Sequence, residues 1–198
     1  MRILVVGATG VIGSEIVRAL EPDHEVLRAS FGKSPIRVDL ERSDSIEAMY
    51  RQTGKVDAVV SAAGQAKFAP LAELRDADFA LSLRNKLMGQ VNLVRLGFGS
   101  VRDSGSFTLT SGVLASSPMV GSAAISLVNA AIEGFVRAAA LEAPRGIRVN
   151  AVSPPWVAET LRALGMDPTG GLPAATVARA YVESVTGPRT GAVIEPKG

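Results

Sequence analysis

The amino-acid sequence predicts an α/β fold, a single domain built on a doubly wound parallel β-sheet. Short apolar runs alternate with helical patterns along the whole chain. The runs are continuous rather than alternating in polarity, as in RILVV at 2–6 and DAVVS at 57–61. Continuous apolar strands are typical of parallel sheets that helices cover on both faces. Right-handed crossovers then place ligands at the carboxyl ends of the strands, beside the switch in strand order.

The composition agrees with one globular domain and excludes several kinds of function. The chain has 198 residues, of which 47% are hydrophobic and 20% charged, enough to bury a substantial core. The net charge of +2 comes from scattered residues, so nothing indicates a nucleic-acid surface. Cysteine is absent, which excludes disulfides and thiol catalysis. With a single histidine, His24, and no cluster of metal-ligating residues, we expect no metal site.

The location of the protein is also predicted from the sequence. Met-Arg leads directly into an apolar strand pattern, without the layout of a signal peptide. The uncharged helical runs are shorter than the ~20 residues that cross a bilayer. We therefore expect a cytoplasmic protein that does not enter a membrane.

In the first half of the chain, apolar runs mark the strands and local patterns mark the helices between them. A glycine-rich turn precedes the first helix, and Asp44 with Glu47 three residues later predicts a capping box for the second. Phe79, Leu83 and Leu87 recur at helical spacing in the third. We expect strands at 2–6, 25–29, 36–38 and 57–61, and helices at 11–20, 44–52 and 77–96.

In the second half, the segment GSAAISLVNAAIEGF at 121–135 belongs to a helix that is apolar on nearly every side. Such a pattern predicts burial on more than one face. Pro173 at a helix start and Gly187 just after its end are typical of a further helix. We expect helices at 117–141 and between 173 and 187, and strands at 106–110, 147–152 and 191–195.

The turn GATGVIG, between the first strand and the first helix, predicts dinucleotide binding. Gly7, Gly10 and Gly13 allow a tight turn, a close approach of pyrophosphate to the amides, and close packing of helix on sheet. The helix N-terminus supplies N–H donors for the phosphates. An ordinary βα turn can also carry three glycines, but its place after the first strand favours the nucleotide. The turn residues expected at the cofactor are Gly7, Thr9, Gly10, Val11, Ile12 and Gly13.

The end of the second strand favours NADP(H) over NAD(H). A carboxylate at this position would bind the ribose 2′-hydroxyl of NAD. The sequence there, RASFGKS at 28–34, contains no acid. It offers cationic and hydroxyl partners for a 2′-phosphate, although a basic edge that is only solvated would have the same sequence pattern. These candidates are Arg28, Ser30, Lys33 and Arg37.

Several stretches, in the right order, resemble the short-chain dehydrogenase/reductase family. The resemblance covers essentially the whole chain and implies a Rossmann-like fold. Its glycine spacing is closer to the extended and atypical branches of the family. The matching stretches are GATGVIG, Asp39-Leu40, SAAG at 61–64, LTSG at 109–112, RGIRVNAVSPPWVAET at 145–160 and TGAVIEPKG at the C-terminus.

The resemblance implies where the adenosine half of the cofactor would lie. Asp39 and Leu40 would bracket the adenine. Ala62, Ala63 and Gly64 would line the adenosine ribose and the pyrophosphate.

It also implies positions for the nicotinamide and the substrate. Ser111 falls at the catalytic serine, whose hydroxyl would bond the substrate oxygen. Pro154 belongs to the nicotinamide segment, and Val157 and Thr160 would meet the carboxamide. Pro155 stands where glycine is usual in that segment. The short connection at about 153–175 leaves a minimal substrate region with a shallow mouth.

The chain departs from the family at the Tyr-x-x-x-Lys pair, which lies on one face of the helix after the serine. The alignment puts Ile125 at the tyrosine and Asn129 at the lysine. Tyr50 and Tyr181, the only tyrosines, lie in other helices. The acid that protonates the product alkoxide is therefore missing, and a positioned general acid is typically worth ~10²–10⁴ in rate.

Lys86 offers one compensation. The family carries an asparagine three residues before a glycine in the helix that precedes the fifth strand, and here Lys86 stands three residues before Gly89. We hypothesise that Lys86 and Asn129 have exchanged places across the site, so that Lys86 restores an ammonium near the nicotinamide ribose. The alternative is a solvated helix residue whose match is accidental.

Two functions remain open. The first is an NADP(H)-dependent oxidoreductase for a small carbonyl compound or alcohol, with Ser111, Lys86 and Asn129 as candidate catalytic residues. The second is a non-catalytic NADP(H)-binding sensor or regulatory protein. The resemblance and the apolar helix at 117–141 also imply a homodimer or homotetramer.

Overall fold

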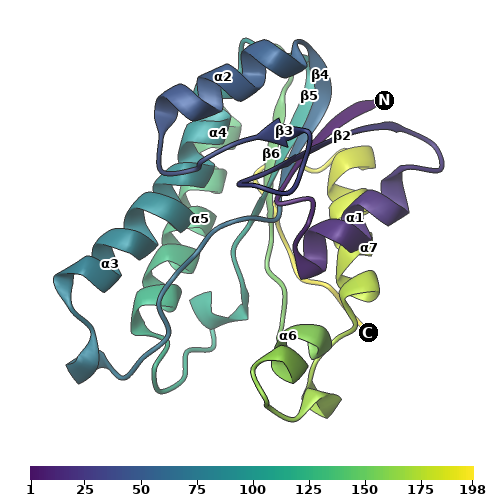
Figure 1. Cartoon of the computed structure of the whole chain (residues 1–198). Helices are drawn as coiled ribbons and strands as arrows, with labels where there is room; N and C mark the ends of the chain where they lie inside the picture. Colours follow the sequence, from purple (N-terminus) through teal and green to yellow (C-terminus); the bar gives the residue numbers. More distant parts are fainter.

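The computed structural model describes residues 1–198, and a seven-stranded sheet runs through its centre (Figure 1). The strand order is β3-β2-β1-β4-β5-β6-β7, and every neighbouring pair is parallel. The order reverses between β1 and β4, which is the switch point of a doubly wound sheet. The strands are β1 (Arg2–Val6), β2 (Glu25–Ser30), β3 (Ile36–Arg37), β4 (Val56–Ser61), β5 (Val101–Thr110), β6 (Arg148–Val152) and β7 (Val193–Ile194).

Helices cover both faces of the sheet (Figure 1). On one face lie α1 (Val11–Leu20) and α7 (Ala174–Thr186), and on the other α2 (Ser43–Thr53), α4 (Gly89–Gly97) and α5 (Ala123–Glu142). Shorter helical segments lie in the connections at the carboxyl edge. They are η1 (Leu71–Glu73), α3 (Asp76–Ser82), the π-helical segment η2 (Leu83–Met88), η3 (Val113–Ala115), α6 (Ala158–Ala163) and η4 (Pro168–Gly170).

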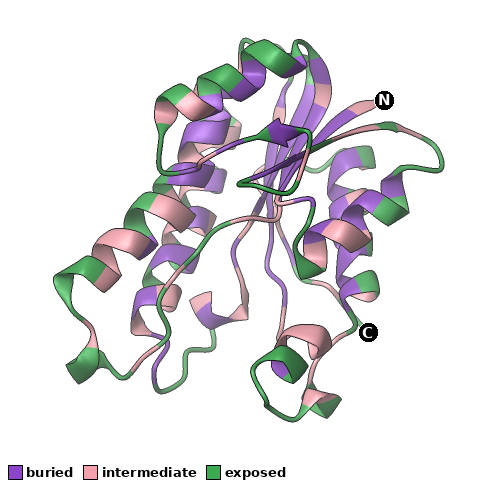
Figure 2. Cartoon of the chain, viewed as in Figure 1, coloured by how far each residue is buried: buried purple, intermediate pink, exposed green.

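The two faces of the sheet bury two separate apolar cores. Because successive residues of a strand point to opposite faces, Ile3 and Val5 of β1 pack towards α1 and α7, whereas Leu4 and Val6 pack towards α2, α4 and α5. Burial is concentrated along the strands and the inner sides of the helices (Figure 2). This confirms the parallel α/β sandwich that the continuous apolar runs predict.

The helix expected at 117–141 is shorter at its N-terminus. It begins at Ala123, after the turn η3 and an irregular stretch. Gly121 has a φ of +89°, a conformation that no α-helix contains, so the helix cannot extend back through it. The strand expected at 191–195 is likewise shorter, at Val193–Ile194.

The capping box expected from Asp44 and Glu47 does not form. The helix begins at Ser43, so Asp44 lies inside its first turn, where its carboxylate accepts from the Ser45 backbone N at 2.9 Å and from the Arg42 guanidinium. By contrast, Pro173 and Gly187 flank α7 as the sequence predicts.

The helix expected at 77–96 is continuous from Asp76 to Gly97 but changes its winding midway. The π-helical segment η2 separates α3 from α4. Such segments are rare and frequently occur at functional sites. This one contains Asn85 and Lys86.

Helix α5 is long and apolar enough to cross a membrane by length and composition, with a mean hydropathy of 1.4. Core helices of α/β proteins can have the same length and apolar composition. One side of α5 is fully buried against the sheet through Val128, Ile132 and Val136. We therefore interpret it as a core helix.

Candidate functional site

The glycine turn leaves the start of α1 free for an anion. Gly10 is the N-cap, with no side-chain cap, and no acidic residue lies in the first turn. A Cβ on Gly13 would lie 1.9 Å from the Gly7 carbonyl oxygen, whereas a Cβ on Gly10 would meet nothing closer than 3.4 Å. Gly13 therefore serves close packing of helix on strand, and Gly10 leaves the approach to the amides open. These are the features that a pyrophosphate requires.

A cavity of about 610 Å³ lies beside this turn, at the carboxyl ends of β1 to β4. Segments far apart in the sequence form it, and six expected cofactor residues border it. They are Gly7, Ser30, Asp39, Leu40, Ala63 and Gly64. We call this the outer cavity.

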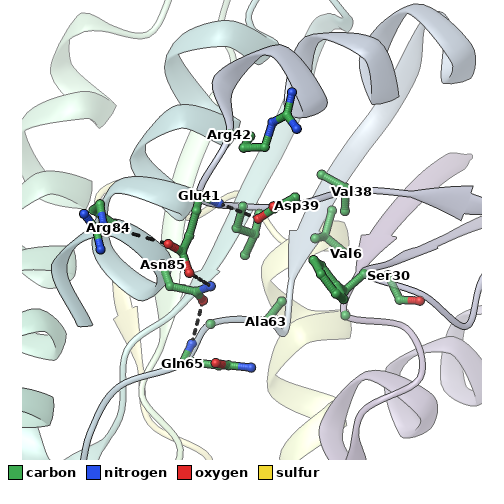
Figure 3. Close-up of a pocket in the computed structure, with 14 residues that line it drawn as sticks. Val6, Ser30, Val38, Asp39, Glu41, Arg42, Ala63, Gln65, Arg84 and Asn85 are labelled. Atoms are coloured by element: carbon green, nitrogen blue, oxygen red, sulfur yellow. Dashed lines mark hydrogen bonds and ion pairs between the residues drawn. The ribbon is translucent and has the colours of Figure 1, made fainter. Parts of the chain in front are cut away.

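A chain of polar contacts crosses the outer cavity from η2 (Figure 3). The Asn85 amide donates to Glu41 Oε1 at 3.0 Å, and its oxygen accepts from the Gln65 backbone N at 2.8 Å. Arg84 lies 3.8 Å from the other oxygen of Glu41. Asp39 accepts from the Glu41 backbone N at 3.0 Å. The π-helical segment is thereby tied to the loop after β3.

The end of β2 lacks a carboxylate, but only one of the four candidates for a 2′-phosphate reaches the outer cavity. Ser30 borders it. Arg28 does not border it, because strand alternation turns the side chain towards α1, where Nε donates to Glu21 Oε1 at 2.9 Å. Lys33 and Arg37 are exposed and do not border the outer cavity.

A second cavity of about 220 Å³, the inner cavity, lies at the ends of β5 and β6. It contains all three residues expected to be catalytic and four residues expected at the cofactor, one from the glycine turn and three from the nicotinamide segment. These are Lys86, Ser111 and Asn129, with Ile12, Pro154, Val157 and Thr160. Of the other expected cofactor residues, Thr9, Gly10, Val11 and Gly13 lie in the glycine turn and Ala62 follows β4 beside Gly7.

Lys86 reaches this site from η2. Its Nζ donates to the Ser111 carbonyl oxygen at 3.2 Å. Burial lowers the pKa of Lys86 from 10.5 to about 8. The completely buried Gln90 joins η2 to the end of β5. Its amide donates to the Lys86 and Thr110 carbonyls and accepts from the Thr110 N at 2.8 Å. Lys86 is thus a positioned group and not a solvated surface lysine.

The Ser111 hydroxyl is turned away from the role expected of it. It donates to Glu133 Oε1 at 3.0 Å and lies 3.3 Å from the Val152 carbonyl oxygen. The residue is 2% exposed. A hydroxyl has one proton to donate, and the Glu133 carboxylate already accepts it. The part of Ser111 that meets Lys86 is its backbone carbonyl.

Asn129 is buried and only half satisfied. Its Nδ2 donates to the Gly112 carbonyl oxygen at 3.3 Å, but its Oδ1 is buried without a partner. A buried acceptor of this kind calls for a donor from a ligand or from water. Ile125, one turn earlier on the same helix, also lines the inner cavity.

Neither tyrosine can stand in for the missing acid. Tyr50 and Tyr181 are buried outside both cavities, and burial raises the pKa of each phenol above its ordinary value. Tyr50 donates to the Leu93 carbonyl, and Tyr181 lies 2.7 Å from the Thr110 hydroxyl.

Sequence reasoning missed several residues that border the cavities. Phe31, directly after β2, is 79% exposed at the outer cavity. Trp156, the only tryptophan, lines the inner cavity and meets Phe68 edge-to-face, with ring centroids 6.5 Å apart. Its place directly after Pro154-Pro155 could have indicated it.

Comparison with known proteins gives one family and consistent structural relatives. The sequence model of a family described as enoyl-(acyl carrier protein) reductase, a short-chain dehydrogenase type, matches residues 7–191. A protein from Listeria innocua is 44% identical, with a TM-score of 0.96 over the whole of both chains. A small-chain dehydrogenase in complex with NADPH is 26% identical, with a TM-score of 0.87 over 98% of this chain and 95% of that one.

Curated relatives match over shorter stretches. A hydroxynaphthalene reductase of Aspergillus fumigatus is 34% identical over 113 residues, 57% of this chain and 41% of the relative. A hydroxynaphthalene reductase-like protein of Metarhizium brunneum is 28% identical over 142 residues, 69% of this chain and 53% of the relative. The match thus spans about half the length of these relatives.

Proposed function

The chain belongs to the short-chain dehydrogenase/reductase family, and from that premise we propose that it is an NADP(H)-dependent oxidoreductase for a small carbonyl compound or the corresponding alcohol. The observation that carries the proposal is the position of Lys86. It puts a titratable ammonium at the inner cavity, held by the Ser111 carbonyl, where the rest of the machinery offers no acid.

The cofactor half of the proposal rests on the uncapped start of α1 and on the two cavities that flank it. The amides after Gly10 would hold the diphosphate, and the outer cavity would hold the adenosine. The end of β2 carries Ser30 where an NAD-binding protein would carry a carboxylate, which favours a 2′-phosphate. The structural relative in complex with NADPH supports the same choice. The Ser30 hydroxyl, which borders the outer cavity, would then be a partner of the 2′-phosphate.

At the other end, Val157 and Thr160 would hold the nicotinamide carboxamide. When bound, the coenzyme supplies a hydride to the carbonyl carbon. The carbonyl oxygen then needs a proton. Lys86 can donate it, because a pKa of about 8 leaves both of its forms populated near neutral pH.

Asn129 and Ser111 have supporting roles in this proposal. The Asn129 amide does not ionise near neutral pH, so it positions the Gly112 carbonyl and offers Oδ1 as an acceptor to a ligand. The Ser111 hydroxyl, bound to Glu133, fixes the end of β5, whose carbonyl anchors Lys86. The resemblance also supports a homodimer or homotetramer.

A non-catalytic NADP(H)-binding sensor is the second candidate. The observation that favours it is the combination of Ile125 at the tyrosine position with a Ser111 hydroxyl that already binds a carboxylate. Such a protein would retain the cofactor site and lack turnover.

One titration separates the candidates. Because Trp156 is the only tryptophan and lines the inner cavity, bound NADPH should quench its fluorescence. We expect NADPH to bind at least ten times more tightly than NADH. Oxidation of bound NADPH by any member of a carbonyl panel, slowed in Lys86→Met, supports the oxidoreductase. Binding without oxidation supports the sensor, and no binding of either coenzyme overturns both.

Ser111→Ala is the companion variant. If its hydroxyl only fixes the end of β5, turnover falls less in Ser111→Ala than in Lys86→Met and the melting temperature drops. A larger loss of turnover in Ser111→Ala, with an unchanged melting temperature, would restore a direct role for the hydroxyl.

A further inference from the structure

The inner cavity is polar on one side and mainly apolar on the other, and this division indicates the kind of substrate that fits it. Its polar groups gather at the end of β5, where Lys86 meets Ser111 and Asn129 meets Gly112. Apart from Thr160 on α6, the remaining wall is mainly apolar and comes from η3, α5 and the connection after β6. The main side chains of this wall are Leu114, Ile125 and Trp156.

Charge is almost absent from this cavity. Lys86 is the only titratable residue among those that line it, and one of the three N–H donors of its ammonium already binds a carbonyl oxygen. The outer cavity differs, because Asp39, Glu41, Arg42 and Arg84 all border it. A carboxylate or phosphate on the substrate would therefore lose its hydration in the inner cavity without a guanidinium or a second ammonium to replace it, which is unfavourable.

The approach to the cavity is apolar as well. The segment after β4 crosses to the start of α5, where the Ala69 N donates to the Gly121 carbonyl oxygen at 3.0 Å. Phe68, on this segment, packs against Gly121 and lies edge-to-face with Trp156. Beside it, Val120 is 86% exposed. Exposed apolar side chains around a pocket often mark a binding site for apolar groups.

We infer that the substrate is an uncharged carbonyl compound whose apolar ring or chain packs against Trp156 and Ile125, with its oxygen towards Lys86. This inference rests on the proposed function and narrows it. The cavity of about 220 Å³ also has to admit the nicotinamide ring, so the substrate is compact. Burial of its apolar surface supplies the affinity.

Trp156 provides a direct reporter for the test. The protein is first saturated with NADPH, which tests the proposed function by itself. The complex is then titrated with cyclohexanone, with the fused-ring ketone 2-tetralone and with 4-oxocyclohexanecarboxylate, while Trp156 fluorescence and NADPH oxidation are followed. We expect saturable changes with both neutral ketones and at least tenfold weaker binding of the carboxylate.

The outcomes are distinguishable. If NADPH does not bind, the proposed function fails and this inference fails with it. If NADPH binds but the carboxylate binds as tightly as cyclohexanone, or neither neutral ketone perturbs Trp156, the substrate inference alone is overturned.

A variant reverses the preference. Ile125→Lys places a cation in the apolar wall and should strengthen binding of the carboxylate at least tenfold while weakening that of cyclohexanone. A thermal scan verifies that it is folded. Unchanged relative affinities in folded Ile125→Lys would show that Ile125 does not contact the substrate and would overturn the placement. If the variant does not fold, the comparison of analogues in the wild type decides.

Discussion

At the scale of single residues, Lys86 combines burial with a held position, and its pKa makes a pH prediction possible. Below pH 8 it is charged and can donate a proton, and above pH 8 it is increasingly neutral. Carbonyl reduction should therefore fall as the pH rises through about 8. Lys86→Met should lose this dependence together with ~10²–10⁴ of the rate. The measurement is kcat/KM against pH.

Lys55→Met is the matched control, because Lys55 also donates to a backbone carbonyl, that of Gly99 at 2.5 Å, but at the protein surface. It should leave the profile unchanged. A second readout is stability. The lowered pKa means that charged Lys86 is disfavoured in the fold, so Lys86→Met should melt higher at pH 7, and the gain should shrink as the pH rises from about 8 towards 10.5. An unaltered rate and pH profile in Lys86→Met would remove Lys86 from the mechanism.

The sequence identified the residue types of the site better than their orientations. Lys86 and Asn129 both line the inner cavity, as expected from the spacing of Lys86 to Gly89 and from the alignment of the long helix with the family. Arg28 lies towards α1 in the structure, and proximity in sequence does not reveal which face of a strand a residue occupies. The orientation of the Ser111 hydroxyl was not predicted, because its partner, Glu133, is 22 residues away. Tertiary contacts of this kind leave no local pattern.

At the scale of elements, the two glycines at the start of α1 make opposite predictions. Gly10→Ala should fold normally, because a Cβ there meets nothing closer than 3.4 Å and its φ of −79° suits alanine. It should weaken NADPH binding at least tenfold by crowding the phosphate site. Gly13→Ala should destabilise the fold by several kcal/mol or prevent folding, since its Cβ would lie 1.9 Å from a carbonyl oxygen.

Thermal scans and NADPH titrations of the two variants give the measurement, with Gly99→Ala as a control, since nothing lies within 4 Å of its added Cβ. If Gly10→Ala bound NADPH as tightly as the wild type, the diphosphate would have to lie elsewhere.

Existence and order of the main elements could be predicted, whereas their ends and winding could not. Continuous apolar runs dictate buried parallel strands, and all seven are present. The start of α5 was misplaced because the residues before Gly121 are compatible with a helix, and only the positive φ of that glycine excludes it. The π-helical turn at 83–88 was not predicted, because it is fixed by contacts such as that of Asn85 with Gln65 and Glu41.

At the scale of the whole molecule, the solvent side of α5 makes a prediction about assembly. Small and apolar residues form a stripe along it, which is unusual for a solvated helix face. The stripe consists of Leu127, Ala130, Gly134, Ala138 and Leu141. We expect a homodimer or homotetramer that uses this face.

Light scattering after size exclusion gives the measurement. Leu127 is 48% exposed in the single chain, and the substitution Leu127→Glu should shift the protein towards monomer. Leu164→Glu, at another exposed leucine on α6's C-terminal side, is the control that should not. A concentration-independent monomer in the wild type would contradict the expectation.

The sheet ends in β3 on one side and β7 on the other, and each of these border strands contains two residues. A long flat border would offer a row of unpaired amides and carbonyls to any passing chain, which is how uncontrolled fibre growth begins. Borders this short give an incoming strand almost nothing to pair with. Short border strands are one of the devices by which proteins limit edge-to-edge pairing, and they leave the helices as the larger surfaces through which copies can meet.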